Sequence, residues 1–336
     1  MTTLVTGGAG FIGTNVADRL LRDGARVRIL DNLARRGVED NLGWLQARHG
    51  ERLEVELADI RDGAAVRRAV RGVDRVFHFA AQVAVTTSLD DPSDDFGVNA
   101  EGTVRLLEAL RGTRVPLLFT STNKVYGSLP DLELHRSGDR WTLPGSAGIS
   151  EERPLSFCTP YGCSKGAADQ YVLDYAHSFG LPTVVFRMSC IYGPHQHGNE
   201  DQGWVAHFLL RALAGEEIVL YGDGAQVRDI LFVDDLVEAM LRAIDAAPLL
   251  AGTAFNVGGG PDNTTSLLEL IDLIHELNGE RPRVTFADER PGDQRYYVSD
   301  TQRLERALGW RPRVGVEEGV TALQRWLTST RATAAA

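Results

Sequence analysis

The sequence predicts an α/β fold in which a doubly wound parallel sheet is followed by a smaller C-terminal α/β domain. Three observations favour it. Apolar, strand-like runs alternate with helix-like stretches through the first half, a glycine-rich turn joins the first strand to the first helix, and the second half is less regular. Parallel sheets covered on both faces have continuous apolar strands separated by helices. We therefore expect βαβ units in the first half.

The expected strands of this sheet are short and apolar, at residues 4–6, 27–30, 53–57, 73–79, 116–120 and 183–186. Helical spacing of apolar residues between them predicts helices at residues 11–22, 98–110 and 161–179. Residues 128–160 differ, because they are rich in glycine, proline and charge and show little periodicity. This composition predicts a long loop, and such loops often carry function.

Further helices are expected in the second half. Ser266 and Glu269 have the spacing of a capping box ahead of the apolar run 267–277. Residues 235–244 and 301–308 also have helical spacing.

We place the domain boundary near residue 186. This gives an N-terminal domain of residues 1–186 and a mainly substrate-binding domain of residues 187–330. Residues 331–336 are small and weakly polar, which predicts a disordered tail.

Composition narrows the class of protein. The net charge of −11 disfavours general binding to nucleic acid or to anionic membranes, and no run of 18 apolar residues is present. The three cysteines, Cys158, Cys163 and Cys190, lack metal-like spacing and cannot all pair. The N-terminus enters a strand almost at once, without the pattern of a secretory leader. We therefore expect a cytoplasmic protein.

Residues 6–13 read Thr-Gly-Gly-Ala-Gly-Phe-Ile-Gly and lie between the first strand and the first helix. Gly7 allows the tight turn, Gly10 lets the backbone approach a pyrophosphate, and Gly13 permits close packing of helix on strand. The phosphate is expected at the positive N-terminus of the helix, beside Phe11 and Ile12. This setting predicts a dinucleotide site of the Rossmann type.

Asp31 ends the second strand, 18 positions after Gly13. A carboxylate there accepts hydrogen bonds from ribose hydroxyls and repels a 2′-phosphate, so NAD is favoured over NADP. Arg35 and Arg36 follow closely and weaken that preference. Asn32 and Arg36 are counted among the expected cofactor contacts.

Other expected cofactor contacts lie at or beyond the ends of the third and fourth strands. They are Asp59 and Ile60 for the adenine, Ala80 and Ala81 near the nicotinamide half, and Asn99 on the following helix. We interpret His78, in the fourth strand, as a packed strand-end residue rather than a catalyst.

Tyr161 and Lys165 are four residues apart and share one helix face. A cationic lysine favours a phenolate and lowers a tyrosine pKa from its usual value near 10, which suits a base for alcohol oxidation. Thr122 follows the fifth strand closely, and a hydroxyl at the C-terminal end of a strand points into the crevice that binds ligands. The plain alternative is a tyrosine packed on a helix, and the order of these residues after the glycine motif favours catalysis.

Together these residues resemble the extended short-chain dehydrogenase/reductases, which are mainly NDP-sugar epimerases and dehydratases. The resemblance covers nearly the whole chain. The matching stretches are the glycine motif, Asp31, residues 121–127, Tyr161 with Lys165, and residues 187–194, 227–235 and 290–293.

The resemblance implies a resident NAD and no metal. It also implies that Tyr161 takes the proton of a sugar hydroxyl, that Thr122 polarises the reacting oxygen, and that Lys165 holds the nicotinamide ribose.

Residues 31–44, 122–127, 160–171 and 201–205 more narrowly resemble the CDP-tyvelose (CDP-paratose) 2-epimerases. Asn123 and Lys124 stand where the related 4,6-dehydratases carry the Asp-Glu pair that serves elimination of water, so dehydration is disfavoured. The resemblance implies epimerisation at C2, although nothing physical in these residues distinguishes C2 from C4.

Substrate contacts are expected from polar and aromatic residues in both halves of the chain. Guanidinium groups suit phosphate oxygens, so Arg228 and Arg290 are candidates for the substrate diphosphate. The other candidates are Thr122, Asn123, Lys124, Gln202, Trp204 and Val205, with Trp204 equally compatible with a core position. His195 and His197 lack a carboxylate or cysteine spaced to complete a metal site.

Three functions remain open at this point. The first is an NDP-sugar 2-epimerase acting on a CDP-, GDP- or UDP-hexose, and the second is a 4-epimerase or another NDP-sugar oxidoreductase. The third is a regulatory NAD-binding protein without chemistry, which could dispense with Tyr161, Lys165 and Thr122. The resemblance also implies a homodimer or homotetramer that pairs through residues 98–110 and 161–179.

Overall fold

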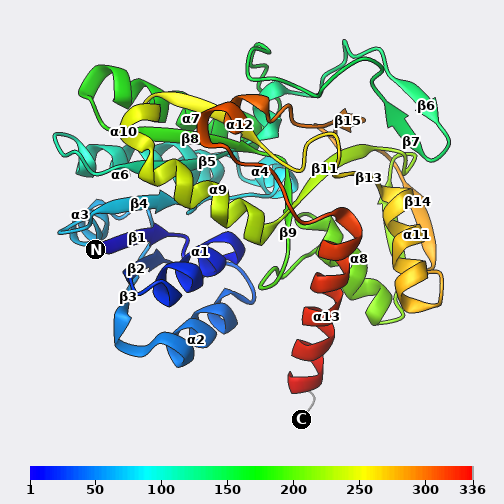
Figure 1. Cartoon of the computed structure of the whole chain (residues 1–336), viewed down its shortest axis with the longest axis horizontal. Helices are drawn as coiled ribbons and strands as arrows, with labels where there is room; N and C mark the ends of the chain where they lie inside the picture. The colour runs from blue at the N-terminus through cyan, green and yellow to red at the C-terminus, as the bar shows by residue number, and fades with distance from the viewer. Residues whose placement is uncertain (335–336) are drawn as a thin grey trace. The chain divides into compact units, whose positions relative to one another are not determined.

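The computed structural model describes the backbone of residues 1–334 and the side chains of residues 1–330 (Figure 1). Its contacts divide the chain into two compact units. Unit 1 comprises Met1–Val125, Thr159–Arg187 and Val237–Phe255, and unit 2 comprises Tyr126–Cys158, Met188–Leu236 and Asn256–Ala336.

The chain changes unit at Arg187, beside the boundary placed near residue 186, and at four other points. Two of these exchanges exist because the strand Thr253–Val257 returns to the sheet of unit 1. A single division of the sequence therefore describes the units only in part. A strand of only five residues has no compositional feature from which its return to the sheet could be predicted.

A seven-stranded sheet in the order β12-β8-β5-β4-β1-β2-β3 forms the centre of unit 1. Strand β1 pairs in parallel with β2 on one side and with β4 on the other, so the strand order reverses there. Ligands of such sheets bind beyond the carboxyl ends of the strands, at the reversal. The predicted doubly wound sheet is confirmed. The strands are β1 (Thr2–Thr6), β2 (Arg26–Asp31), β3 (Leu53–Leu57), β4 (Arg75–His78), β5 (Leu117–Thr122), β8 (Thr183–Met188) and β12 (Thr253–Val257).

The helices around this sheet form where apolar residues recur at helical spacing. One core cluster joins the sheet to side chains such as Leu106, Leu107 and Val172, and full burial of a side chain of this size contributes about 1.5–3 kcal/mol. The helices are α1 (Phe11–Arg22), α2 (Val38–His49), α3 (Gly63–Ala69), α4 (Val85–Asp90), α5 (Pro92–Phe96), α6 (Gly102–Leu110), α7 (Thr159–Phe179), α9 (Val233–Asp245) and α10 (Ala247–Leu250). A π-helical stretch, η2 (Gly97–Glu101), joins α5 to α6.

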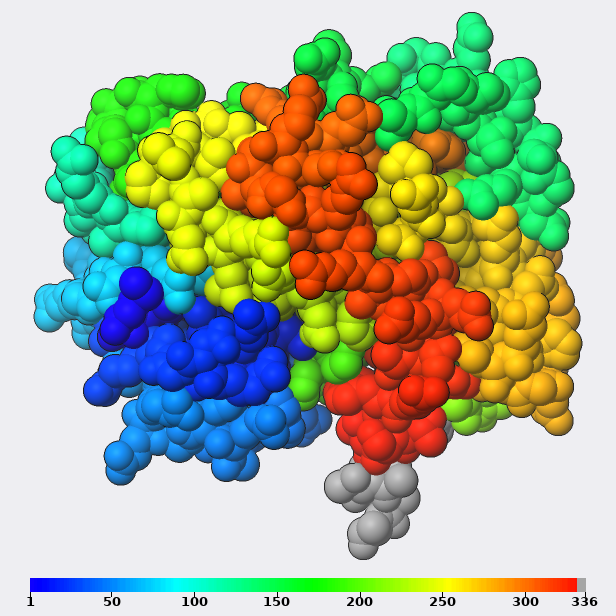
Figure 2. Space-filling view, viewed as in Figure 1, coloured from blue at the N-terminus to red at the C-terminus, as the bar shows by residue number. Residues whose placement is uncertain are grey.

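Helices α1 and α2 contact each other directly. In the space-filling view their side chains, drawn in blue, form one continuous surface (Figure 2). The turn that leads into α1 is the glycine motif, so this packing fixes the helix whose N-terminus belongs to the predicted cofactor site.

Unit 2 is built on smaller sheets. Strand β11 (Val227–Phe232) pairs with β9 (Cys190–Tyr192), β13 (Thr264–Ser266) and β15 (Tyr296–Tyr297), and β10 (Ile218–Tyr221) pairs with β14 (Val284–Ala287). The helices are α8 (Trp204–Leu213), α11 (Leu267–Asn278), α12 (Gln302–Leu308) and α13 (Val316–Ala334). The predicted capping box of Ser266 and Glu269 is present at the start of α11.

Two segments differ from their prediction. The expected loop at residues 128–160 contains an antiparallel hairpin of β6 (His135–Ser137) and β7 (Arg140–Thr142), two strands too short to show periodicity. Within the expected disordered tail, α13 runs through Ala334, because alanine favours helix. Residues 335–336 lie outside the described part of the chain.

Among the described helices, none combines the length and the hydropathy needed to cross a membrane.

Candidate active site

Steric crowding explains the glycines of the β1–α1 turn. Gly7 has a φ of +66°, and a Cβ there would lie 2.6 Å from the backbone nitrogen of Ala80. A Cβ on Gly13 would lie 2.3 Å from the carbonyl oxygen of Gly7. Gly10 begins α1 without a side-chain cap, which leaves the first N–H groups of the helix to a ligand. The turn therefore fits a pyrophosphate, as its sequence predicts.

Asp31 lies beside this turn and is held by backbone donors. Its carboxylate accepts the N–H groups of Ala9 at 3.0 Å and Leu33 at 2.9 Å. Burial raises the pKa of Asp31, and these backbone hydrogen bonds oppose the rise. Since each carboxylate oxygen has two lone pairs, Asp31 keeps the capacity to accept a ribose hydroxyl.

The predicted adenine contacts also lie near this edge. Asn32 donates to Asp59 at 3.1 Å, and Arg61 holds the pKa of Asp59 at about 2. Ile60 is buried and limits the space at Gly102, where a Cβ would lie 2.7 Å from its side chain. The structure thus brings Asn32 and Asp59 together.

The remaining predicted cofactor residues lie at the same edge with different exposure. Ala80 is in contact range of Gly7. Phe11, Ile12 and Ala81 are half-buried, and Arg36 is exposed.

At the other end of the site, Thr122 and Tyr161 meet. Thr122 is the last residue of β5, Tyr161 lies in the first turn of α7, and the two side chains are hydrogen bonded. Burial raises the pKa of Tyr161 to about 12, against the lowering effects of Thr122 and Arg35. This direction is the reverse of the expected one, because burial outweighs the nearby cation. The cation is Arg35, which the sequence had linked only to the preference between NAD and NADP.

Lys165 is buried one helical turn beyond Tyr161. Its Nζ donates to the carbonyl oxygen of Thr120 at 2.7 Å and lies 4.2 Å from the ring centroid of Phe119. Burial lowers the pKa of Lys165 to about 7, and the carboxylates of Asp169 and Asp95 oppose that shift. Lys165 therefore titrates in the physiological range.

Asn99, predicted as a cofactor contact, is bonded within the protein. Its carbonyl oxygen accepts the N–H of Gln82 at 2.9 Å, and its amide nitrogen donates to Asp95 at 3.1 Å and Ser164 at 3.0 Å. Sequence reasoning missed Asp95 and Ser164. The spacing of Asp95 and Asn99, i and i+4 on successive helical segments, is the signal that could have found this pair.

His78 is fully buried between two hydroxyls. Its Nδ1 lies 2.6 Å from Oγ1 of Thr6, and its Nε2 lies 2.9 Å from Oγ1 of Thr103. Burial, with the charge of Lys165, lowers the pKa of His78 to about 3. A neutral, enclosed imidazole agrees with the interpretation of His78 as a packing residue.

Both arginines predicted to bind phosphate are paired with carboxylates. Arg228, almost fully buried, donates to Asp293 at 2.7 Å. Arg290 pairs with Glu200 at 3.1 Å and Asp201 at 3.3 Å, and its guanidinium lies 3.7 Å from the ring centroid of Tyr221. A phosphate at either arginine has to compete with these carboxylates.

The other predicted substrate residues have varied surroundings. Val205 is 2% exposed and belongs to the core of unit 2, and Trp204 packs against that core with its indole N–H directed to Cys190. Gln202 lies in a turn with Asn199. Asn123 is buried beside Thr122 and Lys124 is half-buried. No cluster of three or more metal-ligating side chains occurs in the described residues.

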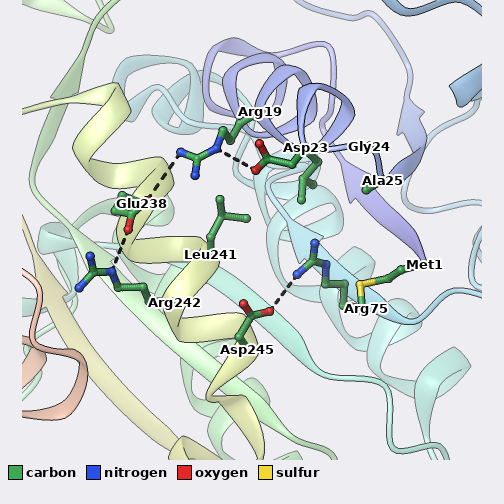
Figure 3. A pocket seen from close by; sticks show the side chains of 11 residues that line it. Met1, Arg19, Asp23, Gly24, Ala25, Arg75, Glu238, Leu241, Arg242 and Asp245 are labelled. Carbon is green, nitrogen blue, oxygen red and sulfur yellow. Dashed lines mark hydrogen bonds and ion pairs between the residues drawn. The ribbon is translucent and has the colours of Figure 1, made fainter.

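A cavity of about 520 Å³ in unit 1 lies elsewhere (Figure 3). Met1, Ala25 and Arg75 line it, and they lie at the amino ends of β1, β2 and β4. The catalytic candidates follow the carboxyl ends of the strands. Its arginines are engaged by acids, as in the pairs Arg19–Asp23 and Arg75–Asp245. This cavity is not the candidate active site.

Comparison with known proteins places this geometry in a family. Residues 3–258 match the model of the NAD dependent epimerase/dehydratase family. The chain is 40% identical to a CDP-paratose 2-epimerase of Salmonella typhi (98% of this chain and 100% of that protein aligned). It is 37% identical to a UDP-glucose 4-epimerase of Mycolicibacterium smegmatis, with 95% and 96% aligned.

The fold also matches a solved structure. The UDP-glucose 4-epimerase of Thermus thermophilus, crystallised in complex with NAD, aligns with a TM-score of 0.82 and 35% identity over 98% of this chain and 99% of that one. The chain belongs to the NAD-dependent epimerase/dehydratase family.

Proposed function

We propose that the protein is an NAD-dependent epimerase of a nucleotide-diphosphate sugar that inverts C2 by transient oxidation. The observation that carries the proposal is the set Thr122, Tyr161 and Lys165 in the same unit as the glycine turn. The 40% identity to a CDP-paratose 2-epimerase over the whole of both chains supports C2 and a CDP-sugar.

The residues present fit NAD. The β1–α1 turn has no room for side chains at Gly7 and Gly13, and α1 presents uncapped N–H groups for the pyrophosphate. In this proposal Asp31 accepts a hydroxyl of the adenosine ribose. When bound, NAD supplies a hydride acceptor for the first half of the reaction and the hydride donor for the second.

Tyr161 is the base in this proposal. It takes the proton of the sugar hydroxyl as the hydride leaves the same carbon, and it returns that proton after the keto-sugar has turned and been reduced on its other face. The pKa of Tyr161 is about 12 and has to be lowered before the phenol can act as a base. The positive charges of Lys165, Arg35 and an oxidised nicotinamide act in that direction.

Thr122 is hydrogen bonded to Tyr161, and in this proposal it orients the reacting oxygen. Its neighbours Asn123 and Lys124 cannot act as an acid–base carboxyl pair. Elimination of water from the sugar is therefore disfavoured, which separates this chain from the dehydratases of the same family.

We propose that Arg228 and Arg290 bind the diphosphate by exchanging carboxylates for phosphate oxygens. Asp293 holds Arg228, and Glu200 and Asp201 hold Arg290. These acids keep both guanidinium groups oriented until the substrate arrives. Gln202 and Trp204 remain proposed contacts of the nucleotide.

The second candidate is a 4-epimerase of an NDP-hexose. The 37% identity to the Mycolicibacterium smegmatis UDP-glucose 4-epimerase favours it. The mechanism and the roles of Tyr161, Thr122 and Lys165 are the same, and the carbon presented to the base differs.

Incubation with CDP-, GDP- and UDP-hexoses, followed by NMR without added nicotinamide, tests the proposal. Inversion at C2 is expected. Inversion at C4 would establish the second candidate, and absence of turnover with NAD still bound would favour a regulatory protein. The same reaction in D₂O should leave the inverted carbon free of deuterium, because hydride return excludes exchange with solvent.

We also propose a cytoplasmic homodimer or homotetramer. The chain has three cysteines, an odd number without metal-like spacing, which suits a reducing compartment. Phe96, Tyr171 and Phe179 lie in or beside the helices expected to pair and are between 44% and 56% exposed. Light scattering after gel filtration should give two or four chains per particle, and a monomer would contradict the proposal.

A further inference from the structure

A buried carboxylate that the proposed mechanism does not use lies next to the Tyr161–Lys165 helix. Asp95, on α5, is 1% exposed. Its carboxylate accepts the hydroxyl of Ser164 at 2.5 Å and the amide of Asn99 at 3.1 Å. Ser164 directly precedes Lys165, and its hydroxyl lies 3.2 Å from the carbonyl oxygen of Tyr161. One carboxylate is thus bonded to the turn that carries both reactive side chains.

The other groups that face Lys165 are neutral or already paired, which leaves Asp95 to balance its charge. Within α7, Asp169 also faces Lys165, but Arg187 of β8 neutralises Asp169 through two hydrogen bonds of 2.9 Å. From β4, His78 is neutral, and from β5 the carbonyl oxygen of Thr120 accepts the ammonium group.

Asp95 itself accepts its hydrogen bonds from a hydroxyl and an amide, which carry no charge. A buried ammonium ion needs a compensating charge nearby.

We propose that Asp95 is the counterion of Lys165 and, through Ser164, the residue that positions the Tyr161–Lys165 turn. The catalytic importance of this turn rests on the proposed function, whereas the role of Asp95 as counterion does not. Asp95 is a positioning residue, since it acts through Ser164 and Lys165.

The electrostatic consequence has a definite direction. The charge of Asp95 raises the pKa of both Lys165 and Tyr161. At Tyr161 the charge of Arg35 acts in the opposite direction. Asp94, beside Asp95 on α5, faces Asp95 and pairs with Arg61. Loss of the Asp95 charge should therefore move both ionisations to lower pH.

The composition allows a direct measurement. The chain has only two lysines, Lys124 and Lys165. Protein labelled with ¹³C at lysine Cε gives two side-chain signals, which Lys124→Arg assigns. The full-length protein with its NAD is titrated by NMR, and Lys165 is expected to titrate near pH 7.

Asp95→Asn is the test variant and Asp90→Asn is the control. An asparagine at position 95 can keep a hydrogen bond to Ser164 and one to Asn99 while removing the charge. Asp90 is an exposed acid at the end of α4. The midpoint of Lys165 should move to lower pH in Asp95→Asn and stay in place in Asp90→Asn. An unchanged midpoint in Asp95→Asn, or an equal shift in both variants, would overturn the proposal.

If Asp95→Asn does not fold, Asp95→Ser removes the same charge in less space and is judged by the same shift. Turnover gives the second readout. The pH profile of Asp95→Asn should move to lower pH as a whole, whereas a residue with only a structural role lowers the rate equally at every pH. If the wild-type protein shows no turnover but the Lys165 midpoint still moves in Asp95→Asn, the result supports Asp95 as the counterion and rejects the proposed epimerase.

Discussion

The two ends of the site in unit 1 are built from different interactions. The cofactor end, comprising Gly7, Gly10, Gly13 and Asp31, is set by backbone geometry: glycines fill spaces too small for a Cβ, and backbone N–H groups hold the carboxylate. The reactive end, comprising Thr122, Tyr161 and Lys165, is set by buried charge. Substitutions at the first end should therefore act through sterics, and substitutions at the second through electrostatics.

The largest effect is expected at the buried ion pair that supports the reactive end. Asp169 and Arg187 are 0% and 6% exposed in their side chains. Asp169→Asn leaves the guanidinium without its counterion, which should cost about 3–5 kcal/mol of unfolding free energy. Urea unfolding followed by circular dichroism measures it.

The exposed pair Arg19–Asp23 provides the control. Asp23→Asn should cost at most about 0.5 kcal/mol, because solvent screens the pair. Equal losses in the two variants would show that burial does not set the strength of the Asp169–Arg187 pair.

Next in size is the loss of the proposed base. Tyr161→Phe removes the phenol and keeps the ring, so turnover should fall at least about a hundredfold, the low end for general acid–base catalysis. Bound NAD, read by absorbance of the released nucleotide, should be unchanged because the cofactor end is untouched. Turnover close to wild type would remove Tyr161 from the mechanism.

At the cofactor end, Gly13→Ala should destabilise the protein by about 1–3 kcal/mol, the usual cost of overpacking. The added Cβ would lie 2.3 Å from the carbonyl oxygen of Gly7. NAD content should fall with it. Thermal unfolding and NAD content of the purified variant measure both effects.

Gly43 is a matched control, because it lies in helix α2 with no atom near its Cβ position. Gly43→Ala should be neutral or stabilise the protein by up to about 1 kcal/mol, since alanine favours helix. If both variants behaved alike, crowding would not be the reason for Gly13.

The same contrast explains what the sequence could predict. Helix Phe11–Arg22, strand Leu53–Leu57 and the capping box at Ser266 depend on neighbours within a few positions, and the structure has them as predicted. The glycine turn is also local. Short-range rules of spacing and conformation were therefore enough for the glycine turn and for most elements of the sheet.

The electrostatics of the reactive end could not be predicted in this way. Asp95 and Ser164 are 69 positions apart and meet only in the fold. Burial reverses the expected pKa shift of Tyr161, and the cation that opposes it is Arg35. Likewise, the carboxylates that hold Arg228 and Arg290 lie 65 to 90 positions away from them. Charge patterns set by tertiary contacts have no local sequence pattern.

The last effect concerns pH and separates the two ends once more. His78 has a pKa of about 3 in the folded protein, against about 6.5 when unfolded. Below pH 6.5 this imidazole therefore binds a proton in the unfolded chain but stays neutral in the folded chain. The stability that neutral His78 contributes is complete above pH 6.5 and falls by about 1.4 kcal/mol per pH unit below it.

Urea unfolding of wild type and His78→Asn between pH 7.5 and 4.5 measures this contribution. The variant should lose stability less steeply on acidification, although it is less stable at pH 7.5 because the bonds to Thr6 and Thr103 are weakened. His135→Asn, in the exposed strand β6, should follow the wild-type slope. Parallel curves for wild type and His78→Asn would mean that water reaches the imidazole, and the reactive end would then be less enclosed than its hydrogen bonds indicate.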